Sequence, residues 1–438
     1  MTFTACDVLD VDPMHSMPAD QAITNAQGVQ RGIIGSYDAM QGVGYYGRNY
    51  VVIGDLAADN LIWSGTTAGY DQINSNNILA DNVIVEGIWA SIYSSLNRVN
   101  NVIVQIPGVG DMTQGQKDQA LAELYFLRAL HHYNLMRLFG PVPIRTQPAT
   151  AEEASLNLPR SSVADVLQQV ETDLAFATEH LPDNIIRGRA TRPAAQALKA
   201  RVSLHKYFIN NNNAFLDEAV NYASAVIAHP NLQLESDFAT LFMGGNNSES
   251  IFEIEFNEQD RNRYAEYFFH TSMSGRYEFS PPAEFIANFT DNDLRKDASI
   301  QMAGTNPYGN KYNDIETGTD NVYVFRLAEM HLIRAEALAL LSPATHLDQI
   351  HDDINAVRER AGLVPTTVSN PNAILLEIEI QRQKEFAFEG HRWFDLVRTN
   401  RAIILLENVT HTDQTLFPIP LTELLANDNP GMGQNPGY

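Results

Sequence analysis

A dense mixture of charged and apolar residues between positions 374 and 398 constrains the fold of this chain more than any other stretch. Apolar side chains such as Leu376 and Ile380 recur at helical spacing, with acids and bases between them, which predicts a helix with one core face. Gly390 interrupts the run and supplies the backbone freedom for a helix end or a sharp corner. An apolar face resumes at Trp393. The sequence therefore predicts two helices that meet at Gly390.

The charges of this segment could serve catalysis or structure. Arg382 lies three residues before Glu385, and Arg392 lies three before Asp395, so salt bridges can form on one helix face without any ligand. Carboxylates paired with arginine keep low pKa values and stay ionised, which does not suit a general acid. We therefore assign a structural role to this charged corner, which comprises Arg382, Glu385, Glu389, Arg392 and Asp395.

Composition limits the partners of the chain. Its 438 residues include 29 Lys and Arg against 53 Asp and Glu, a formal net charge of −24. Such a chain repels phosphate backbones and anionic lipid surfaces, so we expect no nucleic-acid partner. No run approaches the ~18–20 apolar residues of a membrane span. Because there is a single cysteine, neither an internal disulfide nor a cysteine metal cage can form.

Helical periodicity recurs along the chain. It predicts helices over residues 19–40, 83–104, 114–139, 162–181, 191–208, 215–228, 321–341 and 347–361. The alanine-rich segment 191–208 lets neighbouring helices approach closely, as stacked helical pairs require. Alternation over 250–256 predicts a short strand whose wet face carries Glu253 and Glu255. We predict a mainly α fold of tetratricopeptide-like helical pairs with a few short strands.

Two irregular stretches, residues 41–82 and 257–315, interrupt this pattern, and long irregular segments in compact domains are usually functional. Aromatic faces accept sugar C–H groups or cations, while Arg and Asn side chains add directional hydrogen bonds. Each ring could equally be tucked into the core. The candidate ligand contacts are Trp63, Tyr70, Asn60, Asn257, Arg261, Tyr264, Tyr267, Arg276 and Tyr277.

Two short stretches partly match a cofactor motif and a metal motif, but the residues around them do not fit such sites. Residues 42–47 match Gly-x-Gly-x-x-Gly, but a predicted helix precedes them and residues 48–53 look extended, which reverses the order of a dinucleotide site. Residues 291–293 read Asp-Asn-Asp, yet Arg295 and Lys296 stand where a calcium loop needs a further oxygen ligand and the turn glycine. We expect neither a cofactor nor a metal.

The N-terminal residues 1–20 have no helical or strand period and read as a tether before one domain over 21–438. Residues 3–6, Phe-Thr-Ala-Cys, are similar to the end of a bacterial lipoprotein signal, with Cys6 as the lipidated first residue of the mature chain. The alternative is a free thiol on a floppy terminus. Only five residues precede Cys6, so such a signal would be trimmed or lack its start.

Five ordered sequence blocks carry a family resemblance along nearly the whole chain. They are FLRAL at 126–130 with LFGPVP at 138–143, the segment 191–204, RLAEMHLIRAE at 326–336, EGHRWFD at 389–395, and FPIP at 417–420 with QNPGY at 434–438. With these blocks the chain resembles the SusD/RagB family of outer-membrane nutrient-binding lipoproteins.

The resemblance implies a tetratricopeptide-like scaffold whose irregular excursions, here 41–82 and 257–315, carry the ligand site. It implies an acylated cysteine, which Cys6 matches, and a location on the surface of the outer membrane. It also implies a SusC-like TonB-dependent transporter over which the lipoprotein acts as a hinged lid. In such relatives the charged corner is structural.

We therefore expect capture and not catalysis: an oligosaccharide, or alternatively a peptide or another nutrient, is bound and passed to the transporter. A scaffold that grips another protein is a rival. A glycoside hydrolase is a further rival, since it needs two carboxylates about 5–10 Å apart and 53 acids supply pairs. No nucleophile, metal or cofactor motif supports it.

Overall fold

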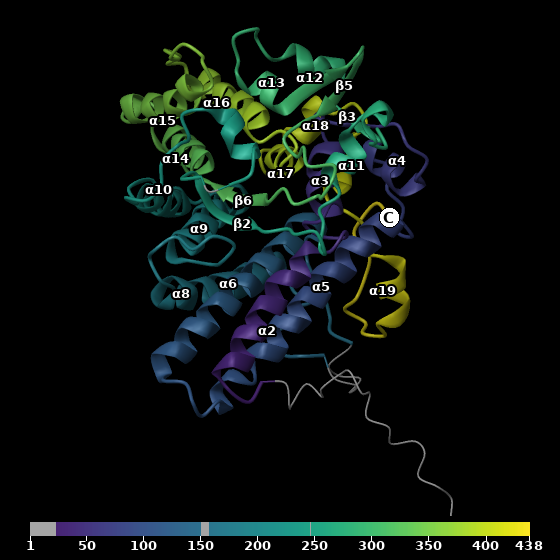
Figure 1. The fold of residues 1–438 in the computed structure, drawn as a ribbon, viewed down its shortest axis with the longest axis vertical. Coiled ribbons are helices and arrows are strands. Elements are labelled where there is room, and N and C mark those ends of the chain that lie inside the picture. The colour runs from purple at the N-terminus through teal and green to yellow at the C-terminus, as the bar shows by residue number, and fades with distance from the viewer. Residues whose placement is uncertain (1–22, 150–156, 246) are drawn as a thin grey trace, which may run out of the picture.

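The structure is a computed structural model that describes residues 23–149, 157–245 and 247–438 (Figure 1). Its first half contains α2 (Ala26–Asp38), α3 (Asn49–Leu56), β1 (Ile62–Trp63), α4 (Ala68–Asn74), α5 (Val83–Ile103), α6 (Gln114–Phe139), α8 (Val163–His180), α9 (Arg192–Asn210) and α10 (Ala214–Ile227). The proposed tether and Cys6 lie outside the described residues, as does the start of the helix predicted from residue 19.

The second half alternates strands and helices. It contains β2 (Ser250–Ile254), α11 (Tyr264–Phe268), β3 (Phe279–Ser280), α12 (Ala283–Ala287), α13 (Arg295–Ser299), β4 (Ile300–Ala303), β5 (Asn306–Gly309), β6 (Val322–Arg326), α14 (Leu327–Leu341), α15 (Leu347–Arg360), α16 (Pro371–Glu385), α17 (Arg392–Arg398), α18 (Ala402–Leu405) and α19 (Leu421–Ala426). Three antiparallel strand pairs form, β1 with β3, β2 with β6 and β4 with β5.

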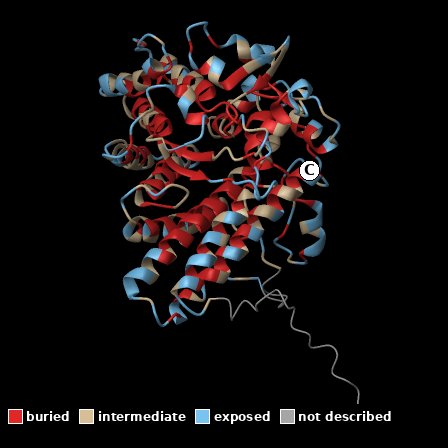
Figure 2. Ribbon diagram, in the orientation of Figure 1, coloured by how far each residue is buried: buried red, intermediate tan, exposed pale blue. Residues whose placement is uncertain are grey.

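Packed helices form the scaffold. Helix α6 packs on α5 and α8, α9 packs on α10, and α10 and α15 pack on α14. Buried residues run through the centre of this array and exposed residues lie at its rim (Figure 2). The alanines of α9, such as Ala194 and Ala197, are fully buried and leave room for the close packing. The predicted mainly α fold of helical pairs is confirmed.

Helix α6 shows why its bounds were predictable. The Thr113 side chain accepts from the Gln116 amide, and the Gln116 side chain accepts from the Thr113 amide at 2.9 Å, so a capping box begins the helix. Gly140 ends it with φ +70°, before Pro141. These signals act within a few residues, and the predicted range 114–139 matches the observed one.

The predicted corner forms between α16 and α17. Gly390 adopts φ +78° there, a left-handed conformation that favours glycine. Gly54 of α3 packs backbone to backbone against it, because a Cβ on Gly54 would lie 2.5 Å from the Gly390 carbonyl oxygen. Helix α3 therefore packs directly against the corner.

Two segments differ from their predicted structure. Residues 321–341 were expected to form one helix, but Val322–Arg326 forms β6, whose backbone pairs with β2, and α14 begins only at Leu327. Residues 48–53 were expected to be extended, but Asn49–Leu56 is helical. All residues of α3 are buried, so it has no polar face to produce a helical period.

The strand predicted over 250–256 forms as β2 and ends at Ile254; Glu255 is exposed as predicted, but Glu253 is not. Glu253 is 1% exposed; Arg187 donates to its carboxylate, and Asn321 Nδ2 donates to it at 2.8 Å. Both faces of this strand pair lie against other elements, so the carboxylate is buried and paired.

Candidate functional site

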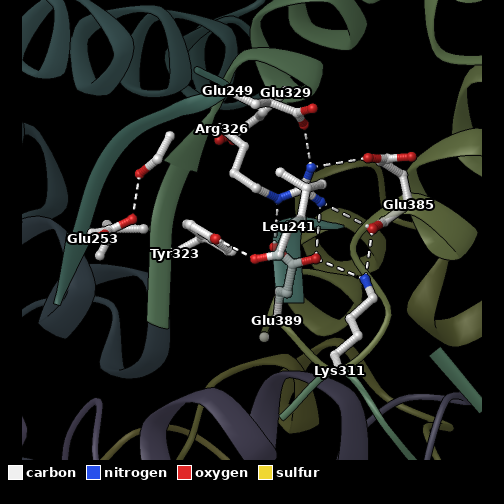
Figure 3. Close-up of polar contacts among 12 residues, drawn as sticks. Leu241, Glu249, Glu253, Lys311, Tyr323, Arg326, Glu329, Glu385 and Glu389 are labelled. Carbon is white, nitrogen blue, oxygen red and sulfur yellow. Dashed lines mark hydrogen bonds and ion pairs between the residues drawn. The ribbon is translucent and has the colours of Figure 1, made fainter. Parts of the chain in front are cut away.

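The charged corner belongs to a buried ion network centred on Arg326 of β6 (Figure 3). Arg326 Nη1 lies 2.5 Å from Glu249 Oε1 and 2.9 Å from Glu385 Oε1, and Arg326 Nε lies 2.8 Å from Glu389 Oε2. Lys311 Nζ lies 2.7 Å from Glu389 Oε1. Charges this deep are tolerated only when they are paired. The contacts support a structural role for Glu385 and Glu389.

Both acids stay ionised. Burial raises the pKa of Glu385, but the guanidinium groups of Arg360 and Arg326 outweigh burial and hold the pKa at about 2. Burial likewise opposes ionisation of Glu389, yet Arg326 and Lys311 keep its pKa below the ordinary value. A carboxyl group with so low a pKa is a poor general acid.

The ion pairs of the corner differ from those predicted. Arg382 Nε bonds Asp395 Oδ2 at 2.7 Å and does not pair with Glu385, because the turn at Gly390 folds α17 back onto α16. Arg392 pairs with Asp59 at 2.7 Å instead of Asp395. The predicted i, i+3 pairs are therefore wrong, since partners from other elements lie closer.

Trp63 lies where the two irregular stretches meet. β1 pairs with β3 so that Trp63 faces Phe279 across the ladder, which joins segment 41–82 to segment 257–315. The Trp63 ring is half-buried and packs on Tyr70 and Phe279, with ring centroids 4.7 and 5.0 Å away. The backbone at Gly65 crosses the indole edge, because a Cβ there would lie 2.3 Å from Trp63 Cζ2. The indole is thus fixed in orientation while part of it faces solvent.

Arg276 lies three residues before Phe279, the residue that Trp63 faces across the ladder. Its Nε donates to Glu278 Oε1 at 2.6 Å, and its guanidinium packs on the Tyr267 ring at 4.5 Å. The Arg48 guanidinium packs on the same ring at 3.9 Å. The Tyr267 ring therefore contacts both arginines, and its side chain is buried. Glu278 Oε2 is buried and has no hydrogen-bond partner within the described residues. Sequence reasoning missed Arg48 and Glu278, because neither stood out from its neighbours.

Tyr277 directly follows Arg276 in the chain. It has φ +53°, is half-buried, and donates from its hydroxyl to the Pro307 carbonyl at 3.0 Å. The His270 ring contacts it edge to face at 5.0 Å. We call Trp63, Arg276, Tyr277 and Glu278 the indole surface, because they lie on the paired strands β1 and β3 or beside them.

Besides Tyr267, three further predicted ligand contacts are buried core residues, so these four predictions are wrong. Asn60 donates to Asp55 Oδ1 at 2.6 Å, and the Tyr70 hydroxyl donates to Asn49 Oδ1 at 2.6 Å. The Tyr264 hydroxyl donates to the Tyr46 carbonyl at 2.5 Å. All three side chains are buried, so their polar groups and faces are already used within the protein.

Asn257 and Arg261 lie in a different place from the indole surface. Asn257 Oδ1 accepts from the Gln259 amide at 2.8 Å, and Arg261 donates to the Glu316 carbonyl at 3.1 Å. Asn257 also lines a polar cavity of about 570 Å³ together with Glu253 and Tyr323. The predicted set therefore divides between two surfaces.

The described residues contain no group of three or more His, Cys, Asp or Glu side chains placed to hold a metal ion. In the same part of the chain, every helix is too short or too polar to cross a bilayer.

Comparison with known proteins gives two matching family models. Residues 7–204 match the family described as starch-binding associating with outer membrane, and residues 245–407 match the SusD family. SusD-like protein P38 of Formosa agariphila is 26% identical over 98% of this chain and 95% of its own length.

Two solved structures share the fold. A SusD superfamily protein from Bacteroides vulgatus superposes with a TM-score of 0.85 over 94% of this chain and 99% of its own, at 22% identity. A laminarin-binding SusD-like protein superposes with a TM-score of 0.81 over 95% of this chain and 100% of its own, at 25% identity.

Proposed function

The chain belongs to the SusD-like family, and on that premise we propose that it captures an oligosaccharide without cleaving it and delivers it to a SusC-like TonB-dependent transporter. The observation that carries this proposal is Trp63, a half-buried indole held in orientation by Tyr70 and Phe279 at the edge of β1. The laminarin-binding relative favours a glycan over a peptide as the ligand.

The indole surface suits a sugar chemically. The solvent-facing part of the Trp63 ring offers an apolar face to sugar C–H groups, and the ring loses little freedom on binding because its neighbours already hold it. The exposed Arg276, which Glu278 holds in place, can donate hydrogen bonds to sugar hydroxyl groups. Capture followed by release favours modest affinity, roughly −4 to −8 kcal/mol.

The test is calorimetry of the purified protein with a panel of oligosaccharides, including laminarin fragments, and of peptides, with the products analysed afterwards. We expect saturable binding of a glycan that is recovered intact. Cleaved ligand would identify a glycoside hydrolase and overturn the proposal. Saturation by peptides alone would keep the capture role and change the nutrient.

Delivery is tested separately, in cells that produce the transporter. We expect the protein to co-purify with it whether or not glycan is present. Association with the transporter in a protein that binds no nutrient would favour the scaffold role instead.

We further propose that Cys6 carries the lipid that anchors the protein at the outer membrane. A lipoprotein cysteine carries more than one acyl chain, which stable anchoring requires. Metabolic labelling with an alkyne fatty acid should mark the natural protein and leave a Cys6→Ser variant unlabelled. Equal labelling of both would refute the anchor.

A further inference from the structure

A second cavity, of about 290 Å³, lies at the junction of α6, α9, α14, α16 and α17. Its apolar wall comes from Met136, Leu204, Ile209, Ile333, Val397 and Leu416. This volume stands at the lower end of ligand pockets, about 300–1,000 Å³, and admits a small organic molecule. Within the described part of the chain, none of the candidate oligosaccharide contacts lines it.

The charged part of the wall is predominantly basic. Four guanidinium groups line the cavity, those of Arg137, Arg201, Arg382 and Arg398, against the two carboxylates Glu329 and Asp395. Arg201 is neutralised by Glu329, with Nη2 and Oε2 2.6 Å apart. Arg398 is neutralised by Glu336 and by Asp395 at 3.0 Å. Arg382 pairs with the same Asp395 and lies 3.9 Å from Glu329, so the charge left without a carboxylate partner is that of Arg137.

Two N–H groups of the lining arginines, Arg137 Nε and Arg382 Nη1, have no acceptor within the described residues, and both atoms are shielded from solvent. Arg382 is only 5% exposed. Arg137 donates to Asn134 Oδ1 at 2.7 Å and packs on the Phe394 ring at 4.0 Å, but no carboxylate in the described ranges pairs with it. Arg137 therefore brings to the cavity a positive charge that no carboxylate of the described residues neutralises.

Two buried histidines beside these arginines, His205 and His391, are neutral. Burial, followed by the charges of Arg137 and Arg398, lowers the pKa of His205 to about 3. Burial, followed by Arg201 and Arg382, holds the pKa of His391 well below its ordinary value. Both rings line the cavity. Burial opposes any charge here, whereas the arginine charges that add to it oppose a cation and attract an anion.

We propose that this cavity binds a small organic anion, with a carboxylate against Arg137 and an apolar body against the aliphatic wall. The planar guanidinium fork matches a carboxylate better than it matches a halide. An inorganic anion would leave the aliphatic wall unused. The proposal goes beyond oligosaccharide capture and is independent of it, because the two sites share no residue.

Benzoate is the probe, and benzamide and inorganic phosphate are its comparisons. Calorimetry at neutral pH should show saturable benzoate binding, with benzamide and phosphate at least about tenfold weaker. If benzamide bound as tightly as benzoate, the site would not require an anion. If phosphate bound more tightly than benzoate, the ligand would not need an apolar body. If benzoate did not saturate the protein, both claims would be overturned. Crystals soaked in 4-bromobenzoate should show the bromine anomalous signal inside the cavity. A signal elsewhere only would refute the location.

Variants distinguish the loss of the Arg137 charge from a loss of the folded structure. Arg137→Gln should weaken benzoate at least about tenfold, whereas Arg31→Gln, on the exposed face of α2, should leave it unchanged. Because Arg137 packs on Phe394, its variant could unfold, and the melting temperature reports this. Ile209→Trp then decides: Ile209 is 46% exposed at the cavity wall, so tryptophan fills the space with every charge intact. Unchanged benzoate binding in a folded Ile209→Trp protein would overturn the proposal.

Discussion

Arg382 of α16 and Asp395 of α17 meet across the corner at Gly390, with Nε and Oδ2 2.7 Å apart. Their side chains are 6% and 12% exposed, so solvent screens the pair little. Asp395 also accepts from Arg398 at 3.1 Å, which ties the end of α17 to the same carboxylate. Asp395 therefore links α16 to α17 through two arginines.

Asp395→Ala should destabilise the protein strongly. Removing one partner of a buried pair leaves an uncompensated charge, which costs about 3–5 kcal/mol. Denaturant unfolding measures the loss. The control is Asp38→Ala, which breaks the solvent-exposed pair with Arg98 and should cost at most about 1 kcal/mol. Similar losses in the two variants would contradict a special role for the corner.

Acid should weaken the fold through the same network. Glu385 has an ordinary pKa of 4.5 and a folded pKa of about 2. Because folding lowers the pKa, its stabilisation is complete above about pH 4.5 and is lost as the pH falls towards about 2. The pKa values of Glu389 and Asp395 are also lowered in the folded protein, since their arginine partners outweigh burial. Melting temperature against pH checks the interval, and a Glu385→Gln variant should show a shallower fall. If the melting temperature of the variant fell with pH as steeply as that of the unchanged protein, Glu385 would not be the source of the acid sensitivity.

Gly390→Ala should cost about 1–3 kcal/mol. A residue with a Cβ is strained at φ +78°, and the new Cβ would lie 2.9 Å from the Val51 carbonyl oxygen. Gly35→Ala is the matched control, because Gly35 lies within α2 and no atom is within 4 Å of its added Cβ. Alanine there should stabilise by about 0.5–1 kcal/mol. Opposite signs of the two changes in melting temperature are the expected result.

Trp63→Ala should weaken oligosaccharide binding at least about tenfold, because the variant loses its stacking face. The ring is half-buried against Tyr70 and Phe279, so a small fall in melting temperature accompanies the loss. Tyr222→Ala, on α10 and away from the indole surface, is the aromatic control and should bind normally. If both variants bound alike, Trp63 would be a core residue only.

The helices and their ends were predictable because their signals are local. Thr113 and Gly140 delimit α6 by hydrogen bonds and backbone angles that involve only nearby residues. The corner at Gly390 was predictable for the same reason. Helix α3 was missed, since its neighbours bury every side and erase the periodicity on which such a prediction rests.

The candidate site was less predictable. Aromatic and polar residues in irregular stretches drew attention to Trp63, Arg276 and Tyr277, and the β1–β3 pair brings Trp63 opposite Phe279, which follows Arg276 and Tyr277 closely in the chain. The same criterion selected Tyr70 and Tyr264, which are buried. An aromatic ring has the same chemistry in the core and on a ligand-binding surface. Residue type alone therefore could not distinguish buried rings from exposed ones.

By itself, the sequence determined the helical segments, the corner and the family, because caps, glycines and short motifs act over a few residues. Only the tertiary structure decided that Val322–Arg326 is a strand, since its hydrogen-bond partners lie in β2, more than sixty residues earlier. It also decided that Arg382 pairs with Asp395, that Arg326 gathers Glu249, Glu385 and Glu389, and that Trp63 reaches solvent while Tyr264 does not. Burial and ion pairing depend on which distant segments come together, and no local pattern carries that information.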